Sequence, residues 1–447
     1  MLTFLKGCKM NNEKQSAQVF ENLLFPKVFE TFRIAIYYKN MMIAFVAVAV
    51  ICLVGWLMDF SQTVVVDEQS GITELQVYME GGADAVKEFR QMREEAGPRE
   101  GVFSTLWHVV GLRFHDSLGS LAALNLLSVA QNVAYCIRAI VWAFRCHFIY
   151  CVIFGLIKLA VISFAGGAIC RFAALQFARG EKPGLIEVLR FTTRKFLSLF
   201  AAPLAPIGII IVIGFFVFLL GLMGNIRWAG ELIMAIFMLL ALLAGFLITI
   251  IIIGAVAGFN LMFPAVVYSG ADCFEAISHA FSYVYSKPWR MAFYTALAAV
   301  YGAICYIFVR LFAFVLLIVT YGLLDVGVFG ATDANKLARI WAKPEFFNLL
   351  GSNGGVSLNW SEGIAAFVVY LLVLAVVGLV LAFIVSFYFS ANTIIYSLMR
   401  NRVDNTALDD IYIYSEEAQT EPGGIEAVSD ESLPQAEAES DSSSTTE

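Results

Sequence analysis

Charged residues and catalytic motifs are scarce in this sequence. Only 15% of its 447 residues are charged and 60% are hydrophobic, whereas about a quarter of the residues of a soluble domain are charged. The chain has no Gly-Lys-Ser phosphate loop, no Gly-x-Ser-x-Gly elbow, no His-Glu-x-x-His pair and no Cys-x-x-Cys. The composition excludes a soluble globular protein. Without these motifs the sequence offers no recognisable set of catalytic residues. We therefore expect neither enzymatic activity nor a cofactor, and we expect no nucleic acid as a partner.

Several apolar runs reach the length of about 20 residues that a helix needs to cross a hydrocarbon core. We therefore predict an all-α polytopic transmembrane helical bundle of about six spans, near residues 41–58, 147–170, 201–223, 232–267, 291–323 and 364–398. The predicted regions are a cytoplasmic N-terminal amphipathic segment (1–40), an extracytoplasmic segment (59–146), a duplicated membrane core (147–323), an extracytoplasmic loop (324–363) and a cytoplasmic tail (399–447).

Basic residues near the ends of the predicted spans indicate how the chain crosses the membrane. Lys27, Arg33 and Lys39 precede the first span, and Arg400 and Arg402 follow the last. Cytoplasmic loops carry an excess of lysine and arginine. We therefore predict a multi-pass protein of the cytoplasmic (inner) membrane, with the N- and C-termini both cytoplasmic.

One region leaves the number of spans open. Residues 118–144, LGSLAALNLLSVAQNVAYCIRAIVWAF, are apolar but contain four polar or charged side chains, Asn125, Gln131, Asn132 and Arg138. We favour a helix that lies on the outer membrane surface. The alternative is a seventh span, which would move one terminus to the other side of the membrane.

A basic segment between two apolar runs, RFAALQFARGEKPGLIEVLRFTTRKFLSLF (171–200), predicts an amphipathic helix on the cytoplasmic interface. After the turn sequence GEKPG, apolar residues recur at helical spacing at Leu185, Leu189, Thr192, Phe196 and Leu199. The nearby cations are candidate contacts for anionic head groups of membrane lipids: Arg171, Arg190, Arg194 and Lys195. A positively charged loop that only sets the topology is the alternative.

The same pattern returns about 90 residues later, in GADCFEAISHAFSYVYSKPWR (270–290), where Gly270 is equivalent to Gly180. A third stretch near the N-terminus, VFETFRIAIYYKNMMIAF (28–45), is similar to the second. We infer duplicated hairpin units, each composed of a span, an amphipathic cytoplasmic helix and a second span.

Three stretches carry a resemblance: GGAICRFAALQFARGEKPGLIEVLRF (166–191), LMFPAVVYSGADCFEAISHAFSYVYSKPWRMAFYTAL (261–297) and TALDDIYIY (406–414). Together they resemble a family of uncharacterised bacterial polytopic membrane proteins, over most of the chain from about Cys146. The second stretch contains a proline, a Glu-Ala pair, aromatic residues and a Trp-Arg pair, in that order. This pattern is also similar to the membrane domain of glycerophosphodiester phosphodiesterases. The catalytic domain of those enzymes has no counterpart here, so the resemblance implies a membrane protein and not that activity.

Two cations, Lys158 and Arg310, fall inside predicted spans. A charge at the centre of a span costs about 2.5 to 3.5 kcal/mol on insertion scales, so such a residue normally faces a bundle interior, a wet cavity or a partner. We therefore predict that both residues are candidate contacts for a lipid or another ligand. The alternative is that their long side chains reach toward the membrane surface.

The remaining polar features suggest no metal site but allow a protein partner. His108, His115 and Asp116 in WHVVGLRFHD (107–116) fit a surface pair better than metal ligands.

From Asp404 onward the tail carries 13 acids and no base, and without it the formal charge would rise from −7 to +6. We predict a disordered acidic tail that offers a contact for a protein partner.

These observations lead to two hypotheses for the function. The first is a non-enzymatic integral membrane protein that handles or transports a lipid or small molecule, with membrane lipids as partners. The alternative is a non-catalytic membrane scaffold or assembly factor.

Overall fold

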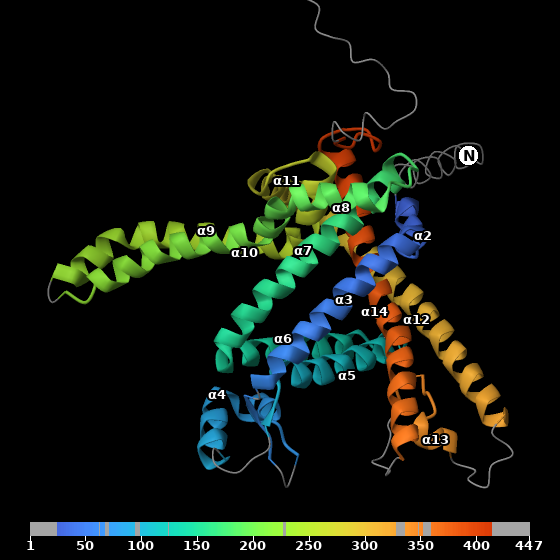
Figure 1. Ribbon diagram of the computed structural model, residues 1–447. Helices are drawn as coiled ribbons and strands as arrows, with labels where there is room; N and C mark the ends of the chain where they lie inside the picture. Colours follow the sequence, from blue (N-terminus) through green and yellow to red (C-terminus); the bar gives the residue numbers. More distant parts are fainter. Residues whose placement is uncertain are drawn as a thin grey trace, which may run out of the picture. The chain divides into compact units, whose positions relative to one another are not determined.

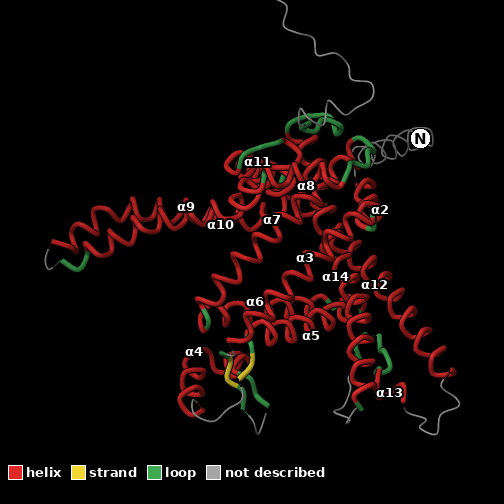
Figure 2. Tube along the Cα trace, viewed as in Figure 1, coloured by secondary structure: helices red, strands yellow, loops and turns green. Residues whose placement is uncertain are grey.

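The computed structural model describes residues 25–61, 63–67, 71–93, 99–123, 125–226, 229–327, 336–346, 348–351 and 359–413. The chain divides into two compact units, Met1–Tyr412 and Ile413–Glu447, and every element below belongs to the first. Helices dominate the described residues (Figure 2), and the strands there, β1 (Val64–Val65) and β2 (Arg99–Glu100), form one short antiparallel pair. The predicted all-α polytopic fold is confirmed. The predicted disordered tail is described as far as residue 413, where residues 404–412 pack against the helices instead, and the rest of it lies outside the described residues.

Seven helices of the described chain are long and apolar enough to cross a membrane. They are α3 (Tyr38–Met58), α6 (Leu126–Cys146), α7 (Phe148–Ala178), α9 (Phe196–Met223), α10 (Ala229–Ser269), α12 (Pro288–Gly327) and α14 (Trp360–Val403). Six of them coincide with the six predicted spans. The additional one, α6, falls in the region for which the sequence left a surface helix and a seventh span open.

The helix α6 pairs with α5 (Val102–Ala122) and runs crosswise to α3 and α7 in Figure 1. The chain bends sharply between α6 and α7 because His147 leaves the helical conformation, with φ −131° and ψ 49°. Length and apolarity alone do not distinguish a surface helix from a span, so both sequence interpretations of α6 remain predictions.

Three helices, α7, α10 and α14, pack against one another in every pairing. We call them the three-helix core. Each packs along a further long helix, since α3 contacts α7, α9 contacts α10, and α12 contacts α14, while α9 also contacts α7 and α3 also contacts α14. Figure 1 shows these three pairs diverging from the region where the core helices meet. Each core helix also contacts a short helix, namely α8 (Leu185–Arg194), α11 (Cys273–Ser286) and α2 (Thr31–Ala35) respectively.

The arrangement therefore repeats three times, although the chain passes through it in an unexpected order. The elements α7, α8 and α9 form one unit, and α10, α11 and α12 form the next. The third unit combines α14 with α2 and α3, which lie at opposite ends of the described chain. This explains why the stretch from Val28 to Phe45 resembles only the second half of the repeated pattern.

The core helices end in the same way. Gly180 after α7 and Gly270 after α10 have φ of +71° and +67°, and Asn405 after α14 has φ of 56°. A left-handed residue stops a helix while its amide groups still satisfy the last carbonyls, and glycine or asparagine adopts this conformation at little cost. The equivalence of Gly180 and Gly270 in the sequence thus has a conformational cause.

A reciprocal pair of hydrogen bonds joins α10 to α14 at equivalent positions. The Tyr268 hydroxyl donates to Ser397 Oγ at 3.2 Å, and the hydroxyl oxygens of Ser269 and Tyr396 lie 2.8 Å apart. Both helices present the dipeptide Tyr-Ser here, so each tyrosine meets the serine of the other helix. Both tyrosines belong to the largest hydrophobic cluster of the described residues.

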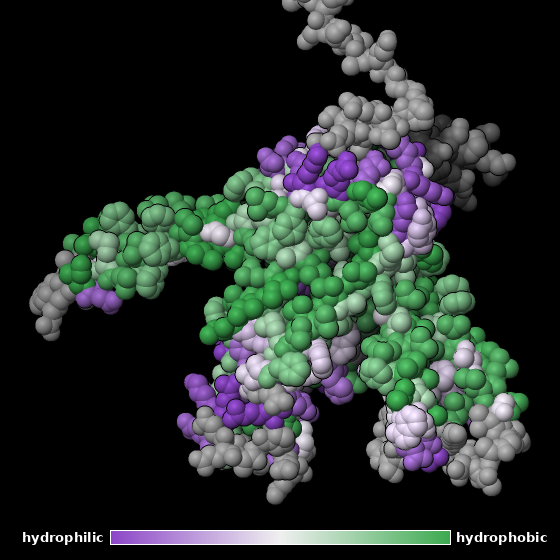
Figure 3. Space-filling model, viewed as in Figure 1, coloured by the Kyte–Doolittle hydropathy of each residue, from purple (hydrophilic) through white to green (hydrophobic). Residues whose placement is uncertain are grey.

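The distribution of polar surface follows this plan. Figure 3 shows hydrophobic residues along the long helices, whereas hydrophilic residues gather over α8 and α11 and again over α4 (Glu74–Arg93). The short elements η1 (Phe25–Glu30), η2 (Asp59–Ser61) and α13 (Lys336–Ile340) complete the described structure. We call the region of α8, α11 and the ends of the core helices the basic end.

The helical boundary after α8 differs from the sequence interpretation. The periodicity placed Phe196 and Leu199 on the same amphipathic helix as Leu185. In the structure α8 ends at Arg194 and α9 begins at Phe196, because Lys195 leaves the helical conformation with φ −93° and ψ 7°. The amphipathic helix is therefore shorter than predicted, and Phe196 and Leu199 belong to the following long helix.

Candidate functional site

The predicted lipid contact Arg171 is fully buried near the end of α7. Its Nη1 donates to the carbonyl oxygens of Tyr412 at 2.8 Å and Val267 at 3.4 Å. Its guanidinium group lies 4.4 Å from the centre of the Phe191 ring. The structure thus places this cation among groups of its own chain, at the junction of α7, α8 and α10.

The neighbouring Lys195 also binds the chain itself. Its Nζ donates to the Gly270 carbonyl at 2.6 Å and lies 3.9 Å from Asp272. Residues 404–412, which we call the C-terminal strap, run across the same region, where the Tyr412 amide donates to the Tyr268 carbonyl at 2.9 Å. The side chains of Arg190 and Arg194 are exposed on α8.

Lys158 and Arg310, the two cations inside predicted spans, have different surroundings. Lys158 is exposed on α7 and makes no hydrogen bond or ion pair with the residues that the structure describes. Arg310 is only 6% exposed and donates through Nε to the Phe346 carbonyl at 2.9 Å. Its Nη1 donates to the Tyr306 hydroxyl at 2.7 Å and to Nε2 of His115.

His115 comes from α5, so this contact joins the α5–α6 hairpin to α12. Burial, together with the positive charge of Arg310, lowers the pKa of His115 below its ordinary value. The imidazole is therefore neutral at pH 7 and can accept the hydrogen bond from Arg310. His108, seven residues earlier, lies instead in a different cavity near Asp59. The described residues contain no group of three side chains that could hold a metal ion.

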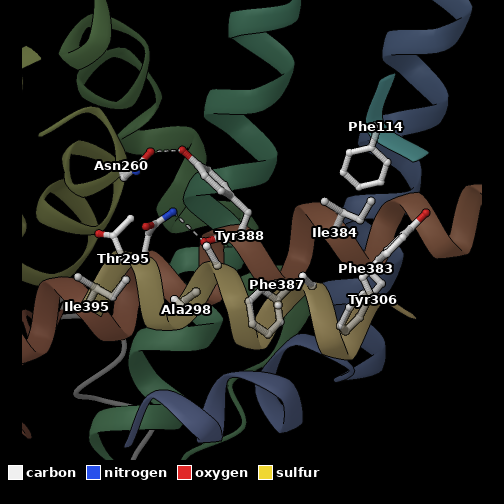
Figure 4. Close-up of a pocket in the computed structure, with 15 residues that line it drawn as sticks. Phe114, Asn260, Thr295, Ala298, Tyr306, Phe383, Ile384, Phe387, Tyr388 and Ile395 are labelled. Atoms are coloured by element: carbon white, nitrogen blue, oxygen red, sulfur yellow. Dashed lines mark hydrogen bonds between the residues drawn. The ribbon is translucent and has the colours of Figure 1, made fainter. Parts of the chain in front are cut away.

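A cavity of about 310 Å³ lies beside Arg310, between α10, α12 and α14, with Phe114 of α5 at its edge (Figure 4). None of its lining residues is charged. They are Phe114, Asn260, Thr295, Ala298, Ala299, Gly302, Ala303, Tyr306, Phe383, Ile384, Phe387, Tyr388, Ala391, Asn392 and Ile395. The volume is at the lower end of the range of about 300 to 1,000 Å³ for small-molecule sites.

Small side chains on one face of α12 create this space. Ala298, Ala299, Gly302 and Ala303 recur at helical spacing toward α14. A Cβ atom at Gly302 would lie 2.6 Å from the Phe387 ring, so the helices are in close contact there. The neighbouring alanines leave the remaining space unfilled.

Polar groups gather at one end of the cavity, where Figure 4 shows Asn260, Tyr388 and Thr295. The Tyr388 hydroxyl donates to Oδ1 of Asn260, and Nδ2 of Asn392 donates to the Tyr388 carbonyl at 2.9 Å. Phe114, Tyr306 and Phe383 lie at the other end. An elongated apolar cavity with hydrogen-bonding groups at one end suits an amphiphilic molecule.

The sequence interpretation found part of this site. It singled out Arg310, which contacts the cavity residue Tyr306. It missed Asn392 and Thr295. The sequence could have identified both, because each is a polar residue within a long apolar run and lies on a helix face with small neighbours. Lys158 does not line this cavity.

A second polar cluster anchors α4 to α6 away from the cavity. Glu74 is fully buried and accepts hydrogen bonds from Arg90 Nη2 at 2.7 Å, Arg90 Nε at 3.1 Å and Trp142 Nε1 at 3.3 Å. His147 Nε2 lies 3.5 Å from the same carboxylate. Burial alone would raise the pKa of Glu74, but hydrogen bonds from His147 and Arg90 lower it below its ordinary value. The Glu74 carboxylate is therefore ionised and held by a fully formed set of partners, as expected of a structural anchor.

No known family profile, curated protein or solved structure matches this chain.

Proposed function

We propose that this multi-pass membrane protein binds a lipid or another lipophilic small molecule in the cavity between α10, α12 and α14. The single observation that supports the proposal most is the cavity itself, which is apolar along its length and carries hydrogen-bonding groups at one end. Such a site within membrane-spanning helices is open to molecules that partition into the bilayer. The proposed activity is binding and transfer without chemical conversion, since the cavity has no nucleophile paired with a base.

The proposal includes a topology. The basic end, with Lys195 and Arg400, lies on the cytoplasmic side of an inner membrane, and α4 with the α5–α6 hairpin lies on the opposite side. α6 is the least apolar of the seven candidate helices, which supports a hairpin in the outer surface of the bilayer and leaves six spans with both termini cytoplasmic.

The test is a substitution that fills the cavity. Ala303→Leu adds bulk on the lining face of α12, whereas Ala296→Leu adds the same bulk on an exposed face of that helix that does not line the cavity. We expect the parent protein, extracted gently from the membrane, to retain a lipophilic molecule in its mass spectrum. Ala303→Leu should lose this molecule and Ala296→Leu should retain it. Identical bound molecules in all three proteins would contradict the proposed function.

A further inference from the structure

The charges around the cavity limit what its ligand can be. All 15 lining residues are uncharged. The cation beside the cavity, Arg310, directs its Nε to Phe346 and its Nη1 to Tyr306 and His115. A charged head placed among the polar residues would lose its hydration without meeting an opposite charge, because Arg310 does not line the cavity and lies at the other end, beside Tyr306. Burying an unpaired charge is far more costly than burying a polar group that forms a hydrogen bond.

The hydrogen-bonding groups that remain specify the head group more closely. The backbone carbonyl of Tyr388 can only accept, so Asn392 must turn its Nδ2 toward it, and its Oδ1 has no partner among the described residues. Asn392 is 5% exposed, so this acceptor is largely shielded from solvent. Asn260 accepts from Tyr388 through Oδ1 and keeps its Nδ2 as a donor without a partner in the described part of the chain.

Thr295 adds a hydroxyl group on the opposing helix, α12, and it too forms no hydrogen bond with the described residues. The cavity thus offers a donor, an acceptor and a hydroxyl group close to one end. A hydroxyl or primary amide on the ligand can donate and accept at once and would satisfy these groups. A purely hydrocarbon ligand would leave them unpaired.

We infer that the ligand is an uncharged amphiphile whose head carries a hydroxyl or amide group and whose chain runs along α12 toward Phe114. This inference rests on the proposed function and narrows it to a chemical class. The head lies against Asn260, Asn392 and Thr295. From Thr295 to Tyr306 the lining face of α12 extends about 16 Å at a rise of 1.5 Å per residue, which accommodates most of a 16-carbon hydrocarbon chain.

Four probes with the same 16-carbon chain test the head group: hexadecanol, hexadecanamide, hexadecyl sulfate and hexadecyltrimethylammonium. Each is added at the same low mole fraction to phosphatidylcholine nanodiscs that contain the full-length protein. Mass spectrometry of the intact complexes then gives the amount of probe bound. We expect the alcohol and the amide to bind at least tenfold more than the sulfate and the ammonium.

Three variants connect this preference to the polar residues. Asn260→Leu and Thr295→Val should each lower binding of the alcohol about three- to tenfold, which is the size expected for one hydrogen bond within a membrane protein. Asn132→Leu changes an asparagine of α6 that does not line the cavity and should leave binding unchanged. Thr295→Val preserves the shape of the side chain, so it decides the question if Asn260→Leu does not fold.

The possible failures can be told apart. If the sulfate or the ammonium binds as well as the alcohol, and Ala303→Leu abolishes that binding, the inference of an uncharged head is wrong while the cavity remains a ligand site. Unchanged binding of the alcohol in both Asn260→Leu and Thr295→Val would also overturn it. If Ala303→Leu reduces the binding of no probe, the proposed function itself fails.

Discussion

Replacing Glu74 by glutamine should loosen α4, because the Glu74 carboxylate joins the two halves of this helix across the bend at Gly82. The carboxylate is fully buried, and it forms a two-pronged pair with Arg90 through bonds of 2.7 Å and 3.1 Å. Glutamine has nearly the same shape but is neutral, and one of its two terminal groups is a donor that faces the donors of Arg90. The substitution therefore removes the charge pair and leaves its positive partner behind.

The expected cost follows from the burial of the two partners. Breaking a fully buried pair costs about 3 to 5 kcal/mol, and breaking an exposed pair costs about 0 to 1 kcal/mol. The Glu74 side chain is 0% exposed and that of Arg90 is 34% exposed, so water can partly solvate the arginine once the pair is broken. We expect a loss of about 2 kcal/mol in the local stability of this region.

Hydrogen–deuterium exchange of the detergent-solubilised protein measures this local stability. A loss of about 2 kcal/mol should accelerate exchange of the amides of α4 about 30-fold. Asp84→Asn is the matched control, because Asp84 pairs with Lys87 on the same helix at 3.1 Å with both side chains largely exposed. It should change exchange less than about twofold. Equal effects of Glu74→Gln and Asp84→Asn would refute the assignment of Glu74 as a buried anchor.

Two further predictions concern acid and the helix ends. Because the pKa of Glu74 is lower in the folded protein than its unfolded value of about 4.3, its stabilisation is complete above that value and is lost as the pH falls through the folded pKa. Below about pH 4, the thermal unfolding midpoint of the parent should therefore decrease more steeply with falling pH than that of Glu74→Gln. Parallel curves of midpoint against pH for the two proteins would contradict this. Gly180→Ala should cost about 1 to 2 kcal/mol through its left-handed backbone alone, since nothing lies within 4 Å of the new methyl group. Gly270→Ala should cost about 1 to 3 kcal/mol more, because its methyl group would lie 2.5 Å from the Tyr412 ring. Thermal unfolding should rank the two glycine variants in this order, and faster amide exchange in the C-terminal strap should accompany only Gly270→Ala.

Some of the site could be found by reading local patterns, and some could not. Arg310 stands out because a cation within an apolar run is rare, whatever it contacts. Its actual partner, His115, lies 195 residues away in the sequence, in a stretch for which the sequence favoured a surface pair of histidines. The role of Arg310 beside the cavity is therefore a property of the fold and not of its own neighbourhood. The same holds for Arg171, whose charge suggested lipid contact and whose side chain is buried among carbonyl groups.

The sequence by itself determined the features that depend on short stretches of chain. Long apolar runs specify membrane-spanning helices because each backbone group must be paired within its own helix. Gly180 and Gly270 specify where helices end because the left-handed conformation is a local preference. Only the tertiary structure decided which helices meet. It joined α14 to α2 and α3 across the length of the chain, and it brought Tyr388 to Asn260, 128 residues apart, to form the polar end of the cavity. Such contacts arise from the fit of whole helix surfaces, and a linear pattern does not specify which surface will be the partner.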